Sequence, residues 1–217
     1  MAGFFYWNML NVDILISFLV ASTALAFAPG PDNIFVLVQS VTHGVKYGVA
    51  TVFGLITGCL IHTSLVAFGV SALIGKNEHL FFILKLFGAI YMVYLAYRVY
   101  ISKAGISFDS SDTPSKGLLQ LYKQGFIMNV LNPKVSLFFL ALFPGFLFSD
   151  RIPVVNQFFI LGFLFMLVTL VVFSLIAIMA GFISNYLKNN TRTPLVIKWL
   201  QIVVFISIAI FILLADK

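Results

Sequence analysis

A long apolar run near the start of the chain, residues 11–41, is interrupted by prolines and a charged residue. The interruption reads Pro29-Gly30-Pro31-Asp32-Asn33. A continuous helix over this run would be about 46 Å long at 1.5 Å per residue, whereas the hydrocarbon core of a bilayer is about 30 Å thick. Each proline also removes a backbone hydrogen-bond donor and clashes with the preceding turn. The sequence therefore predicts a broken helix, which a membrane tolerates only where the freed backbone lines a cavity or is buried in protein.

The composition is typical of helical membrane proteins. Of the 217 residues, 61% are hydrophobic and 9% are charged, whereas a soluble domain has about 25% charged residues. We therefore expect an all-α, polytopic membrane protein whose residues 1–217 form a single transmembrane domain. Most of the basic residues are spread over loops, so the net charge of +6 does not indicate nucleic-acid binding. Cys59 stands alone within a span, so we expect no disulfide framework and no cysteine-based metal site. The sequence has no GxGxxG, Walker, HExxH or GxSxG motif, and we expect no cofactor.

The apolar runs divide the chain into two similar halves of three spans each. Repeat one covers about residues 11–101, a polar linker about 102–116, and repeat two about 117–214. The six spans are expected at residues 11–41, 47–73, 79–101, 117–148, 154–187 and 195–214.

The first span of each half is too long for one straight crossing and contains proline. The second half has its break at Asn132-Pro133-Lys134. Because each half has three spans, the second half must enter the membrane from the opposite side. The pattern predicts a 3+3 inverted repeat with broken first and fourth spans, and such matched breaks point to a transporter's site at the membrane midplane.

Lysine and arginine are distributed unevenly between the two sides of the membrane. The richer side receives Lys46, Arg98, Lys103, Lys116, Lys123, Lys188, Arg192 and Lys198. The poorer side receives Lys76, Arg151 and Lys217. Basic residues accumulate in cytoplasmic loops, so we expect the richer side to be cytoplasmic and both termini to be extracytoplasmic.

Asp32 is the clearest candidate for chemistry. A carboxylate near the middle of a membrane is costly unless it is paired, hydrated or protonated, and such residues usually mark pathways or proton relays. Asp32 also follows Pro31 at the start of the second half-helix, where an acidic residue is a favourable cap. The sequence therefore assigns Asp32 either a binding and proton-coupling role or a capping role, and the two are compatible.

Amide side chains and one lysine complete the candidate site. The asparagines can satisfy freed backbone groups or bind a zwitterion. Lys134 can pair with Asp32, attract a substrate carboxylate, or extend its ammonium group toward the interface. The half-helix N-termini offer backbone donors to an anion. We predict that the substrate-binding residues are Pro29, Gly30, Pro31, Asp32, Asn33, Asn129, Asn132, Pro133 and Lys134.

One face of the second span carries small residues and a histidine. Gly54, Gly58 and His62 are spaced four residues apart and therefore share a helix face. Small residues let another helix approach closely, so we assign Gly48, Gly54 and Gly58 to helix packing. His62 is expected inside the bundle, either as a hydrogen-bonded structural residue or as a second proton-coupling residue beside Asp32.

These motifs together resemble the signature of the LysE/RhtB amino-acid exporter family. After the first break come His43-Gly44-x3-Gly48-x5-Gly54-x3-Gly58-x3-His62 and Lys85-x2-Gly88-Ala89-x-Tyr91-x3-Leu95. The second half contributes Asn129-x2-Asn132-Pro133-Lys134, then Phe138-Phe139 and Phe143-Pro144. The resemblance runs nearly from end to end. It implies a bacterial inner-membrane exporter of amino acids or close derivatives, driven by the proton gradient and often a homodimer.

Two classes of function stay open on the residues alone. One is a secondary transporter of a small zwitterion that works by alternating access, with the amino acid, a proton and the lipid bilayer as partners. The other is a channel-like pore or an integral-membrane enzyme. An enzyme needs clustered histidines and carboxylates, and a channel needs polar residues along one face. Polarity here is concentrated at two breaks, so we expect a transporter rather than an enzyme, with a neutral amino acid favoured over a basic one.

Overall fold

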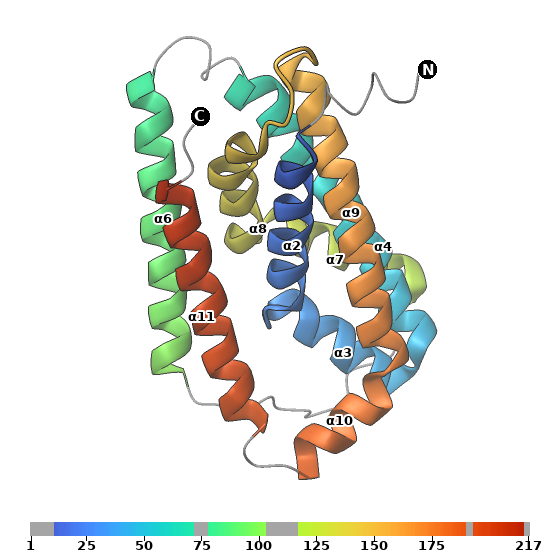
Figure 1. The fold of residues 1–217 in the computed structure, drawn as a ribbon. Coiled ribbons are helices and arrows are strands. Elements are labelled where there is room, and N and C mark those ends of the chain that lie inside the picture. Colours follow the sequence, from blue (N-terminus) through green and yellow to red (C-terminus); the bar gives the residue numbers. More distant parts are fainter. Residues whose placement is uncertain (1–10, 72–77, 103–116, 190–192, 215–217) are drawn as a thin grey trace.

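The computed structural model describes residues 11–71, 78–102, 117–189 and 193–214. In this part of the chain the secondary structure is entirely helical, without strands, and most of the long helices run along a common direction (Figure 1). The prediction of an all-α protein is therefore confirmed.

The helices follow the predicted spans closely, with two differences. The second span starts at Val45 and ends in a π-helix, and the fifth is divided at Met179 into two helices. The elements are α2 (Val12–Phe27), α3 (Pro31–His43), α4 (Val45–Leu65), the π-helix η1 (Val66–Val70), α6 (Glu78–Ile101), α7 (Leu118–Val130), α8 (Pro133–Leu137), the π-helix η2 (Phe138–Leu142), the 3-10 helix η3 (Phe143–Phe146), α9 (Val154–Ile178), α10 (Ala180–Asn189) and α11 (Thr193–Leu214).

Both predicted helix breaks are present. The axes of α2 and α3 differ by 57°, and those of Leu118–Val130 and Pro133–Phe146 by 47°. Pro31 and Pro133 each begin the helix that follows the break. A proline is well placed there because the first N–H groups of a helix have no partner within it.

Apolar helices and an apolar outer surface identify a multi-pass membrane protein. Within the described residues, three single helices are long and apolar enough to cross a membrane, and each bent pair would add one more span. Large side chains such as Phe87, Phe163 and Val203 are more than half exposed on the outside of the bundle, at 66%, 58% and 58%. α6 is 24 residues long and corresponds to the predicted third span. The six-span count, the single domain and the inverted repeat stay predictions, and most of the predicted linker lies outside the described residues.

Close helix packing surrounds the second span. α4 lies along α7 and α9, and α6 lies along α11 (Figure 1). A Cβ added at Gly54 would overlap the backbone carbonyl of Tyr122 on α7, and one added at Gly125 would overlap that of Thr51 on α4. The backbones of α4 and α7 can therefore approach this closely only because both positions are glycine.

The other two glycines assigned to packing are also in crowded places. A Cβ at Gly48 would overlap the Ser40 hydroxyl on α3. One at Gly58 would lie 2.7 Å from Asn129 Oδ1 on α7. The glycines of α4 thus set its distance from both segments that carry the candidate site.

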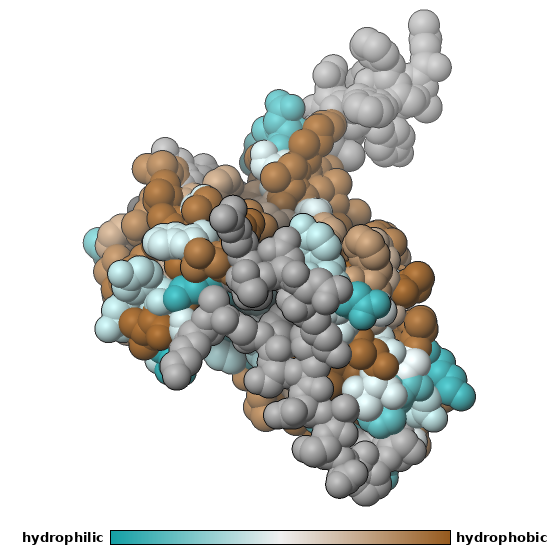
Figure 2. Space-filling model, turned by 90° about the horizontal axis from the view of Figure 1, so that it is seen from below, coloured by the Kyte–Doolittle hydropathy of each residue, from teal (hydrophilic) through white to brown (hydrophobic). Residues whose placement is uncertain are grey.

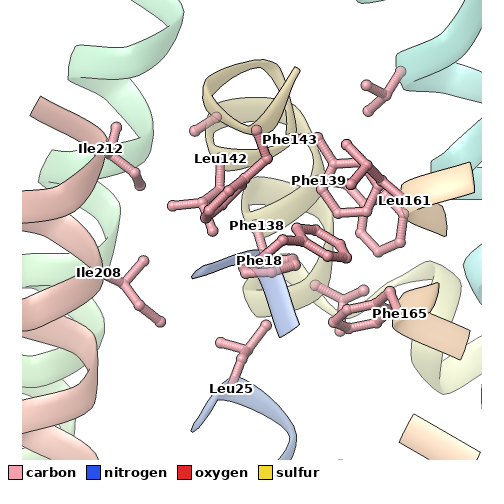
Figure 3. Close-up of a cluster of buried hydrophobic side chains, with 14 of the residues drawn as sticks. Phe18, Leu25, Phe138, Phe139, Leu142, Phe143, Leu161, Phe165, Ile208 and Ile212 are labelled. Carbon is pink, nitrogen blue, oxygen red and sulfur yellow. The ribbon is translucent and has the colours of Figure 1, made fainter. Parts of the chain in front are cut away.

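A cluster of phenylalanines fills the core between the breaks and the upper end of the bundle. Phe138, Phe139 and Phe143 lie between Phe18 on α2 and Phe165 on α9 (Figure 3). The rings of Phe139 and Phe143 are stacked, with centroids 4.1 Å apart, and Phe18 meets Phe143 edge-on at 5.2 Å. All five side chains are buried. This cluster closes one side of the region around the breaks.

The lower end of the bundle carries polar as well as apolar residues. Seen from below, hydrophilic residues are mixed with hydrophobic ones on this end (Figure 2). Lys198 Nζ donates to the carbonyl oxygen of Ser102 at 2.7 Å, which joins the start of α11 to the end of α6. The sequence assigns most basic residues to this end. Some of these, Lys103, Lys116 and Arg192, lie outside the described residues, and so do Lys76 and Lys217, which are assigned to the opposite side. Which side faces the cytoplasm stays a prediction.

Candidate functional site

The first break leaves backbone carbonyls at the end of α2 without helical partners. Pro29 and Pro31 have no N–H to donate to them, and buried carbonyls without partners are costly. Asn33 supplies one donor, because its Nδ2 donates to the carbonyl oxygen of Ala26 at 2.7 Å. Asn33 lies in the first turn of α3 and is 8% exposed. Its buried hydrogen bond therefore ties the start of α3 to the end of α2.

Two side chains from the second half of the chain supply further donors at the first break. Lys134 Nζ donates to the carbonyl oxygen of Ala28 at 2.7 Å. Gln201 Nε2 on α11 donates to the carbonyl oxygen of Pro29. Repeat two therefore completes the hydrogen bonding of repeat one at this point.

The second break is completed by the first half in the same way. Pro133 removes the N–H that would bond to the carbonyl oxygen of Asn129. That oxygen instead accepts from the backbone N–H of Asn132 at 3.0 Å, and His62 Nε2 lies 3.0 Å from it. A carbonyl only accepts, so this bond places the His62 proton on Nε2. His62, 4% exposed, is a hydrogen-bonded residue that α4 contributes to the break.

A direct side-chain bond links the two breaks. Asn132 Nδ2 donates to Asp32 Oδ2 at 2.7 Å, and Asn132 Oδ1 accepts from the backbone N–H of Lys134 at 3.0 Å. Asp32, Asn132 and Lys134 are 5%, 6% and 8% exposed. The two breaks, which the sequence assigns to one site, therefore face each other. Lys134 donates to a backbone carbonyl, a partner that the sequence analysis did not consider, and Asp32 bonds to the amide of Asn132.

A cavity of about 500 Å³ lies beside the two breaks. Its volume is within the range of about 300–1,000 Å³ that is typical of small-molecule sites. The lining residues come from both breaks and from α3, α6 and α11: Pro29, Gly30, Pro31, Ile34, Leu95, Arg98, Val99, Ser102, Asn132, Pro133, Lys134, Gln201 and Phe205. We call it the open cavity.

Positive charge dominates the wall of the open cavity. Among its described lining residues are two cations, Arg98 and Lys134, and no carboxylate. Lys134 Nζ also lies 5.9 Å from the centroid of the Phe205 ring. Two cations on a concave, partly apolar surface attract an anion, so the cavity favours the carboxylate end of a zwitterion.

The predicted site residues fall into three groups. Six line the open cavity: Pro29, Gly30, Pro31, Asn132, Pro133 and Lys134. Asp32 and Asn129 line a smaller buried cavity, which Lys134 also reaches. Asn33 and His62 line neither cavity, and the His62 ring packs on Phe139 with centroids 5.5 Å apart. Among the described residues, His, Cys, Asp and Glu form no group that could hold a metal ion.

Three polar residues of the open cavity, Arg98, Ser102 and Gln201, were missed by the sequence analysis. Gln201 is the single amide side chain in the apolar helix α11. A lone amide among apolar residues could have indicated a polar contact inside the bundle. Arg98 lies in the last turn of α6, where it is indistinguishable in sequence from an arginine at the membrane interface. Its place on the cavity wall depends on the packing of α6 against α11, which no local pattern predicts.

Comparison with known proteins gives a consistent result. The family model described as LysE type translocator matches residues 23–216. The homoserine/homoserine lactone efflux protein of Salmonella typhimurium is 34% identical over 174 residues, covering 80% of this chain and 83% of the relative. The uncharacterized membrane protein YrhP of Bacillus subtilis is 26% identical over 184 residues, covering 81% and 87%. No solved structure gives a significant match.

Proposed function

This chain belongs to the LysE-type translocator family, and we propose that it exports amino acids or close derivatives across the bacterial inner membrane by proton-coupled alternating access. One observation carries the proposal. Two proline breaks from opposite halves of the chain complete each other's hydrogen bonds beside a cavity large enough for an amino acid. Broken helices at such a site are typical of secondary transporters.

We assign the substrate's carboxylate to the cations of the open cavity. Lys134 lines it beside the breaks, and Arg98 lines it at the end of α6. The substrate's ammonium group then lies on the side of the open cavity lined by Asn132, whose amide bonds to Asp32 Oδ2. The name of the Salmonella relatives supports homoserine, a neutral amino acid, and its lactone as first substrates to test.

The two sides of the breaks support alternating access. The open cavity is bounded by Arg98 and Ser102, at the end assigned to the cytoplasm. On the other side, buried phenylalanines such as Phe139 and Phe143 close the path (Figure 3). We propose that export requires this cluster to separate while the cytoplasmic end closes, so that the two sides are never open together.

Proteoliposomes with purified protein test this function and separate it from a channel. We expect saturable counterflow of labelled homoserine, and accumulation of it when a pH gradient is imposed. A channel would give no accumulation by counterflow and would give unitary currents in bilayer recordings. The absence of flux for every amino acid and lactone tested would contradict export.

Arg98→Gln is expected to change substrate preference. A hydrogen bond to a charged group contributes about 1.5–3 kcal/mol, so we expect the apparent KM for homoserine to rise about tenfold or more. Homoserine lactone has no free carboxylate, and its KM should change less than about twofold. The measurement is initial uptake rate against concentration for both compounds. Arg151→Gln, an exposed arginine before α9, is the matched control, and equal changes for acid and lactone would contradict the assignment.

A further inference from the structure

A small buried cavity lies beside Asp32, distinct from the open cavity. Its volume is about 20 Å³. A water molecule needs at least about 10–15 Å³, so one water fits and a larger ligand does not. The lining residues, all buried, are Leu25, Ala26, Asp32, Asn129, Lys134, Val135, Phe165, Thr169 and Phe173.

Two polar atoms on this cavity have no hydrogen-bond partner among the described residues. They are Asp32 Oδ1 on α3 and Thr169 Oγ1 on α9, and their side chains are 5% and 3% exposed. Buried polar groups are nearly always hydrogen-bonded. A carboxylate oxygen can accept one bond from a water, and a hydroxyl can both donate and accept. A single water between them satisfies both atoms.

Lys134 is the residue that reaches both cavities. Its ammonium group bonds to the carbonyl oxygen of Ala28, which leaves further protons on Nζ to donate. A second cation in so small a space would be repelled by this ammonium. The cavity therefore suits a neutral ligand of water's size rather than a sodium ion.

We propose that the small cavity binds one water between Asp32 and Thr169, and that this water passes protons between Lys134 and Asp32 during export. In this step Asp32, protonated from the extracytoplasmic side, gives its Oδ1 proton to the water while the water gives one of its own to neutral Lys134 Nζ. The water is regenerated, Asp32 returns to the carboxylate, and Lys134 releases a proton to the open cavity on the cytoplasmic side. Thr169 does not titrate; it positions the water. The inference rests on the proposed proton-coupled function.

Other titratable groups near the cavity are one residue removed from it. Cys59 Sγ lies 3.7 Å from Asn129 Oδ1, and His62 Nε2 lies 3.0 Å from the Asn129 carbonyl oxygen. Asn129 itself lines the cavity but does not titrate. Asp32 and Lys134 are therefore the two lining residues that can exchange a proton through the water.

Thr169→Val tests the proposal because it keeps the side-chain shape and removes the hydroxyl. We expect pH-gradient-driven uptake of homoserine into proteoliposomes to fall about tenfold or more, since a positioned proton-transfer group contributes about 10²–10⁴-fold. Counterflow without a gradient needs no net proton transfer and should stay within about twofold of wild type. Thr169→Ser should behave as wild type in both assays. So should Thr57→Val, whose hydroxyl bonds within its own helix.

The possible outcomes distinguish a failure of the proposed water site from a failure of the proposed export function. Equal gradient-driven uptake by Thr169→Val and wild type would overturn the proposal, as would a parallel loss of both activities in a correctly folded variant. Wild-type protein that shows counterflow but no response to a pH gradient would overturn the proton path and leave export standing. Wild-type protein without either activity would overturn the proposed function itself.

Discussion

Lys134→Met is expected to lower the free energy of unfolding by about 3–5 kcal/mol and to abolish export. Lys134 and Asp32 are buried on the same small cavity, so removal of the lysine leaves a carboxylate buried without a nearby cation. It also removes the donor to the Ala28 carbonyl. The first effect can be measured by unfolding in mixed micelles and the second by homoserine flux.

A double variant distinguishes the charge effect from loss of packing. In Asp32→Asn/Lys134→Met both charges are absent, so most of the lost unfolding free energy should return, whereas export should not. Lys123→Met, at an exposed position on α7, is the control and should change the unfolding free energy by less than about 0.5 kcal/mol. A Lys134→Met protein with wild-type stability and flux would contradict this account of the buried charges.

Gly54→Ala is expected to cost about 1–3 kcal/mol of unfolding free energy, and larger side chains at Gly54 should prevent folding. The added Cβ would overlap the backbone carbonyl of Tyr122. A backbone group cannot turn aside as a flexible side chain can, so α4 and α7 must separate. Separation would also break the contacts that Asn129 on α7 makes with Cys59 and His62 on α4.

Gly69→Ala is the matched control for this second prediction. It lies in η1, and a Cβ there would meet nothing within 4 Å. Because alanine has the higher helix propensity, this change should leave stability unaltered or raise it by up to about 1 kcal/mol. Equal unfolding midpoints for the two variants, measured in the same detergent, would contradict close packing of α4 on α7.

The breaks and their mutual contact were predictable from the sequence. Proline at positions 29, 31 and 133 removes backbone donors whatever the surroundings. The freed carbonyls and Asp32 then need polar partners, and the polar side chains at depth are few. The sequence therefore constrained which segments had to meet.

The partners within the site were not predictable in the same way. Lys134 had several compatible partners, and its bond to Ala28 depends on which carbonyl lies within reach after folding. Thr169 resembles an ordinary packing hydroxyl in sequence, and only its buried, unpartnered oxygen marks it. Arg98 joins the open cavity through the packing of α6 on α11. Each of these depends on three-dimensional packing, which periodicity and motifs do not encode.

The most direct test of the central claim is protection of Gly30→Cys by substrate. Gly30 lines the open cavity, and a Cβ there would be in ordinary contact, 3.5 Å from Lys134 Nζ. The single native cysteine, Cys59, is buried and can be replaced by alanine. If the breaks bind the substrate, saturating substrate should slow thiol modification at Gly30→Cys and leave it unchanged at Asp150→Cys, an exposed position before α9. Modification of Gly30→Cys at the same rate with and without a transported substrate would contradict the claim.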